Sequence, residues 1–373
     1  MAWRDRRLIE RLGLRSPLIQ APMAGAQASD LAISVAKAGA LGSIPCATLS
    51  PDAVRMHVQR FRDATRDSSS PLNLNFFCHV TAAPSIADRD AHWRERLTPF
   101  YREYGVDLAK MDAAGGAQRK PFDESSLALI QELRPEVATN ALVLSSATTV
   151  NEARWLEARG CDVILAQGFE AGGHRGVFLP PQGSVDGSAP PNSNSYATFA
   201  QQLGTMALVP QIVDAVRVPV IAAGGIGDAR GILAASVLGA AGVQMGTVFL
   251  LSDEAQTSQL HRRALKQAGG NGDHEEAMET AITNVFTGRP ARGFATRLVR
   301  ELGPISPHAP EFPNAGAALV PLKEAAEARN DPAFSSLWSG QSPGFAQEKS
   351  GEAIVRSLNN DLDELVKKIR ASY

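Results

Sequence analysis

Short apolar runs rich in valine, isoleucine and leucine recur along this chain, and they do not alternate with polar residues. Runs of this kind are expected for parallel strands that are covered on both faces. Longer stretches with helical signals separate them, so the sequence predicts an α/β fold with right-handed crossovers. The predicted strands are residues 17–23, 40–45, 72–78, 141–147, 162–168, 218–225 and 242–250.

The arrangement of these strands is predicted to be a TIM-type (β/α) barrel. Residue types suited to catalysis directly follow several different strands, and barrel enzymes collect their chemistry at that end. A barrel of this kind needs eight strands, however, and residues 136–140 are too few for a strand plus a crossover helix. Either a strand is hidden within residues 104–134, or one βα unit is shortened or missing.

The strand and helix alternation fades after residue 286. Helical patterns follow over residues 319–329 and 351–369. We therefore expect a barrel over residues 1–286 and a C-terminal helical extension over residues 287–373 that packs on it. Residues 177–195 are rich in proline, glycine, serine and asparagine, which suits either a mobile lid or a passive insertion.

Composition narrows the class of protein. The formal net charge of −2 gives no reason to expect a nucleic-acid partner. No run approaches the roughly 18 apolar residues that a membrane span needs, and the cysteines and histidines lack metal-binding spacing. The sequence predicts a cytoplasmic enzyme without a metal, a nucleic-acid partner or a membrane partner, and leaves a monomer and a homodimer open.

Two glycine turns follow the last two predicted strands. The first strand ends in Gly224 and Gly225 before a helix that Asp228 can cap, and the second ends in Gln244, Met245, Gly246 and Thr247. Glycine lets the backbone approach an anion, and a helix N-terminus offers free N–H groups. Successive units of this kind form the phosphate site of many barrels. A third glycine and a ribose-binding acidic residue are missing, which favours a mononucleotide over a dinucleotide.

The segment from Gln167 to Gly176 directly follows another strand. Gln167 carries donors and an acceptor that suit the edge of a flavin ring. Gly172 and Gly173 allow close approach of a ligand. His174 can accept a proton near neutral pH, and the alternative is a structural histidine. The sequence predicts a catalytic role for His174.

Four other side chains near the predicted strand ends have less certain roles. Met23 either lies under a flat ring or fills the core. Asn75, on a buried strand, either contacts a ligand or makes a structural hydrogen bond. Glu170 and Arg175 are expected to form ion pairs or to contact the backbone.

These segments together resemble the nitronate monooxygenase family, from about Leu12 to Leu365. Residues 167–176 carry the most specific likeness, and residues 286–293 and 337–341 add to it. The resemblance implies an FMN enzyme that oxidises alkyl nitronates, with propionate 3-nitronate as the toxin to be removed. The flavin would take one electron from the nitronate, and O2 would complete the reaction to a carbonyl compound and nitrite.

The resemblance also implies roles for individual residues. His174 would face the substrate, and Lys323 would be a cationic partner for it. The residues expected to hold FMN are Met23, Asn75, Gln167, Gly172, Gly173, Gly224, Gly225, Gln244, Met245, Gly246 and Thr247.

The chain departs from the family pattern at two places. A histidine-bearing strand of the family is missing at residues 136–140, and Phe312 stands where relatives have tyrosine. Two other functions therefore stay open. One is an FMN-dependent enoyl-thioester reductase that uses NAD(P)H, and the other is a degenerate, non-catalytic flavoprotein.

Overall fold

Parallel strands form the barrel of this protein, which we analysed as a computed structural model. The structure describes residues 3, 5–68, 70–79, 87–107, 121–133, 142–179, 202–269 and 279–372. Five strands pair in the order β1-β8-β7-β5-β4, and β2 pairs with β3. A bridge between Ile19 and Leu41 joins the two groups. The strands are β1 (Leu18–Gln20), β2 (Gly42–Pro45), β3 (Leu72–Asn75), β4 (Leu144–Ala147), β5 (Val163–Gln167), β7 (Val220–Ala223) and β8 (Gly242–Met245).

Each of these seven strands lies within a strand predicted from the sequence, and all their pairings are parallel. Side chains of β1 and β7 are buried along the whole length of both strands. Helices cover the outer face of these strands, and their inner face lies in the barrel interior. The strand order closes as in a TIM-type barrel except between β3 and β4. Residues 134–141 and 108–120, where an eighth strand was sought, lie outside the described residues, and the described part of 104–134 is helical or irregular.

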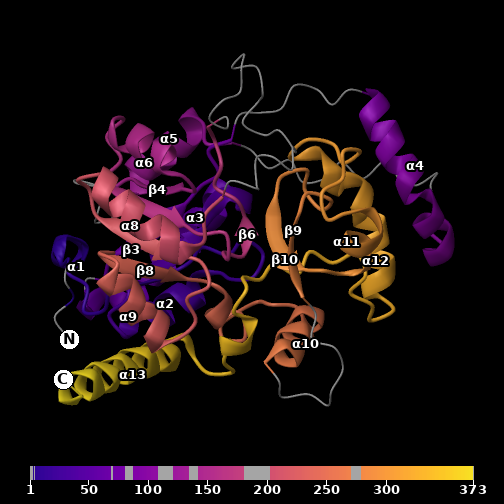
Figure 1. Cartoon of the computed structure of the whole chain (residues 1–373). Helices are drawn as coiled ribbons and strands as arrows, with labels where there is room; N and C mark the ends of the chain where they lie inside the picture. Colours follow the sequence, from indigo (N-terminus) through magenta and orange to yellow (C-terminus); the bar gives the residue numbers. More distant parts are fainter. Residues whose placement is uncertain are drawn as a thin grey trace.

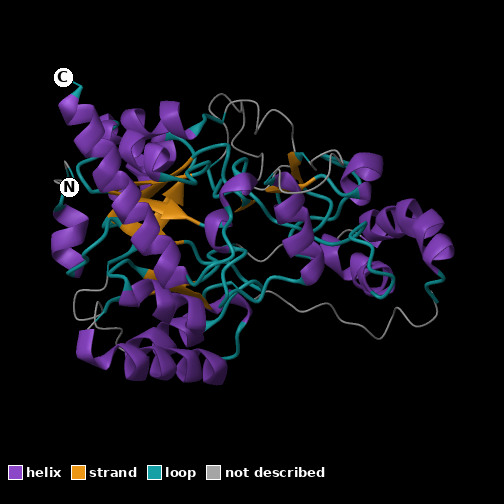
Figure 2. Ribbon diagram, turned by 90° about the horizontal axis from the view of Figure 1, so that it is seen from below, coloured by secondary structure: helices purple, strands orange, loops and turns teal. Residues whose placement is uncertain are grey.

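Helices surround the strands on the outside (Figure 2). Hydrogen bonds at their first turns explain where several begin. Ser50, Thr149 and Asp228 accept hydrogen bonds from backbone N–H groups of the first turn, which stabilises a helix start. The helices of this layer are α1 (Arg7–Leu12), α2 (Ser29–Lys37), α3 (Pro51–Thr65), α5 (Glu124–Leu133), α6 (Val150–Glu157), α8 (Thr205–Ala215) and α9 (Ala229–Val237).

The last helix, α13 (Gly351–Ala371), belongs to the same layer. It lies along α2 and α9, and Figure 1 shows it directly below these two helices. Ile354, Val355, Leu358 and Leu362 share one hydrophobic cluster with the barrel strands. The end of the chain therefore packs against the outside of the barrel and shares its hydrophobic core. A division into two domains at residue 286 stays a prediction.

A smaller antiparallel sheet stands beside the barrel, in the order β6-β10-β9. Figure 1 shows it between the barrel and a group of helices. Its strands are β6 (Gly173–His174), β9 (Thr280–Thr283) and β10 (Ala291–Phe294). The helices on this side are α4 (Ala87–Tyr104), α10 (Gln259–Ala268), α11 (Arg297–Leu302) and α12 (Val320–Glu327).

Helix α4 packs far from its sequence neighbours. Its Trp93 Nε1 donates to the carbonyl of Ala315 (3.2 Å), and the Tyr101 hydroxyl donates to that of Ala318 (2.7 Å). Trp93, Leu97 and Tyr101 form a second hydrophobic cluster with residues 285–334. In the described ranges, no helix combines the length and apolar character that a membrane crossing requires.

Candidate functional site

The two glycine turns lie side by side at the carboxyl ends of β7 and β8. These strands are neighbours in register, with Ala223 opposite Gln244. Gly224 and Gly225 have φ values of 119° and 69°, which only glycine adopts readily. Both turns line one cavity of about 1540 Å³. Every site residue predicted from the sequence lines this cavity: Met23, Asn75, Gln167, Gly172, Gly173, His174, Gly224, Gly225, Gln244, Met245, Gly246, Thr247 and Lys323.

Two hydroxyl side chains, Thr205 and Ser342, hold the first turn in place. The Thr205 hydroxyl lies 2.8 Å from the carbonyl oxygen of Gly224, and the Ser342 hydroxyl donates to that of Gly225 (2.7 Å). Thr205 is in turn fixed by Glu170, whose carboxylate accepts from the Thr205 backbone N–H at 2.9 and 3.0 Å. The turn therefore has a fixed shape before any ligand binds.

The Gln167 side chain makes two hydrogen bonds to the backbone, in addition to its predicted ligand contact. Its Nε2 donates to the carbonyl of His174 (3.0 Å), and its Oε1 accepts from the N–H of Gly176 (2.7 Å). These two bonds pin the segment that carries His174 to the end of β5. The amide retains one N–H, so contact with a ring edge stays a prediction.

His174 is held on β6, which pairs with β10 through Ala291. Its Nε2 lies 3.0 Å from the hydroxyl oxygen of Thr287. The rings of Phe77, Phe312 and Trp338 lie 5.6 to 6.2 Å from the imidazole. The imidazole thus sits in an aromatic enclosure that opens on the cavity. A role in catalysis stays a prediction, as does its structural alternative.

Glu170 and Arg175 contact the backbone, which was one of the two predicted outcomes. Arg175 is 1% exposed and donates to the carbonyls of Gly168 (2.6 Å) and Gln167 (2.9 Å). Burial lowers the pKa of its guanidinium to about 10. Within the described ranges neither side chain forms an ion pair.

Asn75 and Met23 both reach the cavity from the first half of the barrel. The Asn75 amide makes no hydrogen bond to any described residue, whereas its neighbour Asn73 donates to the Ser43 hydroxyl (2.9 Å). Of the two readings for Asn75, this favours a ligand contact. Met23 is half-buried and packs against two hydrophobic clusters.

Lys323 lies at the rim of the site, on α12. Its ammonium is 3.9 Å from the carboxylate of Glu327, and its side chain is 49% exposed. Because solvent screens a cation so exposed, its attraction for an anionic ligand is weak.

Sequence reasoning missed three groups at the cavity: Arg289, the Trp338 ring and His261. Burial lowers the pKa of His261 to about 4, and a hydrogen bond to the Trp338 backbone opposes that shift. Arg289 and Trp338 lie within residues 286–293 and 337–341, which carry part of the family resemblance, but neither residue was given a role of its own. His261 lies on the buried face of α10 with Leu260, Ala264 and Leu265. It belongs to no motif, so no signal in the sequence marked it.

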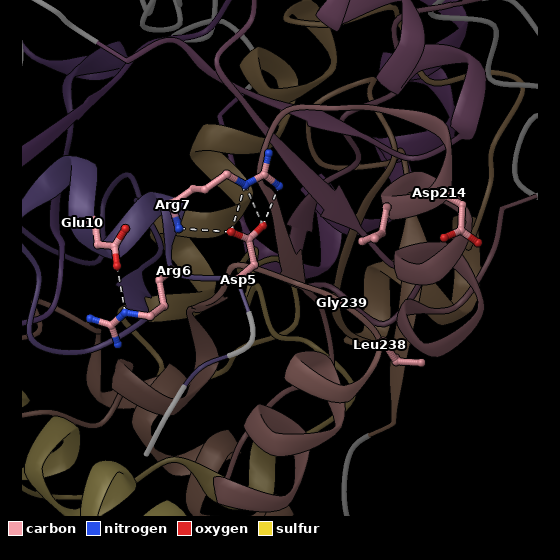
Figure 3. A pocket seen from close by; sticks show the side chains of 8 residues that line it. Asp5, Arg6, Arg7, Glu10, Asp214, Leu238 and Gly239 are labelled. Carbon is pink, nitrogen blue, oxygen red and sulfur yellow. Dashed lines mark hydrogen bonds and ion pairs between the residues drawn. The ribbon is translucent and has the colours of Figure 1, made fainter.

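The opposite end of the barrel has a second, smaller hollow of about 470 Å³ (Figure 3). Four of its charged side chains form two pairs, Arg7 with Asp5 (2.6 Å) and Arg6 with Glu10 (3.0 Å). It has no feature that selects a ligand. No group of metal-ligating side chains occurs among the residues with described positions.

The fold and the site together define a barrel enzyme with its cavity at the carboxyl ends of the strands. The nitronate monooxygenase family model matches residues 5–361. A nitronate monooxygenase from Pseudomonas aeruginosa is 34% identical over 95% of this chain and 99% of the relative. A probable nitronate monooxygenase from Staphylococcus saprophyticus is 31% identical over 95% and 97%. The chain belongs to the nitronate monooxygenase family, whose members are flavin-dependent oxidoreductases.

Solved structures agree with the barrel. Nitroalkane oxidase from Streptomyces ansochromogenes has a TM-score of 0.79 and 29% identity, covering 97% of this chain and 99% of that one. FabK from Thermotoga maritima has a TM-score of 0.64 and 26% identity, covering 99% of both chains. The prediction of a TIM-type barrel is thereby confirmed.

Proposed function

We propose that this protein uses FMN and O2 to oxidise alkyl nitronates to a carbonyl compound and nitrite, with propionate 3-nitronate as substrate. One observation carries the proposal: His174 and two adjacent glycine turns line the same cavity. Family membership supports nitronates as the substrate class. Removal of a toxic nitronate would be the physiological purpose.

The residues present fit FMN. Its phosphate needs a cradle of backbone N–H groups that no side chain obstructs. A Cβ at Gly224 would stand 2.9 Å from the Thr205 hydroxyl, and one at Gly225 would stand 3.1 Å from the Glu170 Cβ. Both positions therefore require glycine. Asn75, whose amide has no described partner, is available to the ring or the ribityl chain.

When bound, FMN would supply the electron-accepting chemistry and the reaction with O2. The chain's own residues would prepare the substrate. His174 would remove the α-proton of a neutral nitroalkane, or donate a hydrogen bond to a nitronate oxygen. Thr287 and Gln167 would keep the imidazole in place, one at Nε2 and the other through the backbone. Phe77, Phe312 and Trp338 would exclude water from it.

The absorption spectrum of the purified protein tests the cofactor, and anaerobic titration with propionate 3-nitronate tests the substrate. We expect a bound flavin that is released by heat and identified as FMN by chromatography, and bleaching of its colour by the nitronate. Protein that remains colourless after FMN is added would contradict the proposal.

An FMN-dependent enoyl-thioester reductase is the second candidate, because the same glycine turns would serve it and the barrel is shared with FabK as well as with nitroalkane oxidase. Anaerobic bleaching by NADPH without any nitronate would favour it. A third outcome, normal flavin content without turnover of nitronates or enoyl thioesters, would indicate a non-catalytic flavoprotein.

A further inference from the structure

Three arginines stand in the wall that carries His174. Arg175 and Arg292 are 1% and 3% exposed, and Arg289 is half-buried. Burial lowers the pKa of each guanidinium, as expected when a cation loses its water without gaining a close carboxylate. In the part of the chain with described positions, none of the three forms an ion pair.

Two carboxylates lie near these arginines, and backbone groups already occupy both. Glu152 accepts from the N–H groups of Thr148 (2.7 Å) and Phe178 (2.8 Å), and Glu170 accepts from Thr205. With three cations and two anions, the described wall holds one positive charge in excess. A buried excess charge is costly, and an anionic ligand would offset that cost.

Arg289 is the member of this cluster that can meet a ligand. The donors of Arg292 go to the Phe169 carbonyl and to Thr280, and Arg292 does not line the cavity. Arg175 lines the cavity, but its Nε, Nη1 and Nη2 already donate within the protein. Arg289 lines it, with Nε and Nη2 bound to the carbonyls of Arg175 (3.4 Å) and Val177 (2.7 Å). Its Nη1 makes no hydrogen bond to any described residue. A guanidinium anchored on one side in this way can present its other N–H groups to a carboxylate.

Arg289 and the imidazole share an anchor. The Thr287 hydroxyl oxygen accepts from the Arg289 backbone N–H (3.4 Å) and lies 3.0 Å from His174 Nε2. One rigid wall therefore offers both a group for the reacting end of a substrate and a cation for its other end. Lys323, the cation that the family resemblance indicates, is half exposed and has Glu327 beside it.

We propose that Arg289 binds the carboxylate end of the nitronate substrate, and that it selects nitronates that carry this second negative charge. The inference rests on the proposed function. It assigns the recognition of that carboxylate to Arg289 and not to Lys323.

Steady-state kinetics with two substrates test it: propionate 3-nitronate, and propane 1-nitronate, which has the same carbon chain without the carboxylate. Arg289→Gln should raise KM for propionate 3-nitronate by about 10- to 100-fold, the effect of losing one charged hydrogen-bonded contact. KM for propane 1-nitronate should change less than about 3-fold, and Arg289→Lys should fall between. Arg263→Gln removes one charge from an exposed position on α10 and should leave both KM values unchanged.

A binding measurement on the wild type does not depend on the variants folding. Butanoate and butanamide have the same shape and differ in charge, so butanoate should inhibit competitively at about 10-fold lower concentration. Arg289→Lys should reduce that preference.

Three results would overturn the inference. Equal losses for both nitronates in Arg289→Gln would mean that the residue only holds its backbone segment. A selective loss in Lys323→Met but not in Arg289→Gln would return the role to Lys323. If the flavin-loaded wild type oxidised neither nitronate, the proposed function would fail, and this inference with it.

Discussion

The surroundings of His174 bear directly on its predicted role as an acid–base group. Its imidazole lies beside the hydroxyl of Thr287 and the rings of Phe77, Phe312 and Trp338. Phe312, where the family resemblance indicates a tyrosine, has no hydroxyl to offer this enclosure but keeps its ring packed 5.6 Å from the imidazole. The substitution therefore makes the surroundings of the imidazole less polar without opening them.

Replacing His174 by asparagine should leave flavin binding intact and lower kcat/KM for neutral nitroalkanes by roughly 10²-fold or more, the usual scale for an acid–base group. Stopped-flow reduction of the flavin measures the step directly. Oxidation of preformed nitronate should fall less, because no proton has to be removed from it. Wild-type rates with nitroalkanes would show that the histidine is structural.

The lowered pKa of His261 predicts that the stability of the fold depends on pH. Its pKa of about 4 in the folded protein is below the ordinary value of 6.5, so the unfolded chain binds a proton between these values and the folded chain does not. The stability that the neutral imidazole contributes is complete above pH 6.5 and is lost as pH falls towards 4.

Between pH 7 and pH 5 this group alone should lower the free energy of unfolding by about 2 kcal/mol. Urea titrations at the two pH values measure it. His261→Asn, which can keep a donor to the Trp338 backbone, should show a pH dependence smaller by about that amount. An identical pH dependence in both proteins would refute the assignment.

At the scale of elements, α8 and the turn after β7 act as one unit. Thr205, in the first turn of α8, lies within hydrogen-bonding distance of Glu170 and of the Gly224 carbonyl. The glycine turn thus depends on a residue about twenty positions earlier and on the end of β5. Family motifs do not reveal such a dependence, because the glycines are visible in the sequence and their supports are not.

Thr205→Val should weaken FMN binding by about 10-fold, since an unpaired buried carbonyl costs about 1–3 kcal/mol and loosens the turn. Fluorescence titration of the apoprotein with FMN gives the Kd. The matched control is Thr98→Val, which removes an exposed hydroxyl bound to the Arg94 carbonyl of α4. Equal Kd values for the two variants would show that the turn does not need Thr205.

In the molecule as a whole, the two largest hydrophobic clusters bring together segments that lie far apart in the sequence. Helix α4 comes early but packs with residues 285–334, and α13 comes last but packs with the barrel. Figure 1 shows both ends of the chain on the barrel side, away from α4. A cytoplasmic location, a homodimer and a lid at residues 177–195, of which 180–195 lie outside the described residues, stay predictions.

Because α13 shares the barrel core, Leu358→Ala should lower the free energy of unfolding by about 2–5 kcal/mol. Leu358 is 2% exposed. Leu365, on the same helix but half-buried, is the control, and Leu365→Ala should cost clearly less. Chemical denaturation followed by flavin release and by circular dichroism would show whether the barrel and α13 unfold together. A loss of less than 1 kcal/mol in Leu358→Ala would place α13 outside the core.

The seven parallel strands, the helix start at Asp228 and both glycine turns could be predicted from the sequence, because apolar runs, capping side chains and glycines act on their nearest neighbours along the chain. The hydrogen bonds of Gln167, the rings around His174 and the position of Arg289 at the cavity could be seen only in the folded structure. These answers depend on contacts such as that between His174 and Thr287, which are 113 positions apart. Such pairs are set by how the layers pack, and no local pattern encodes that packing.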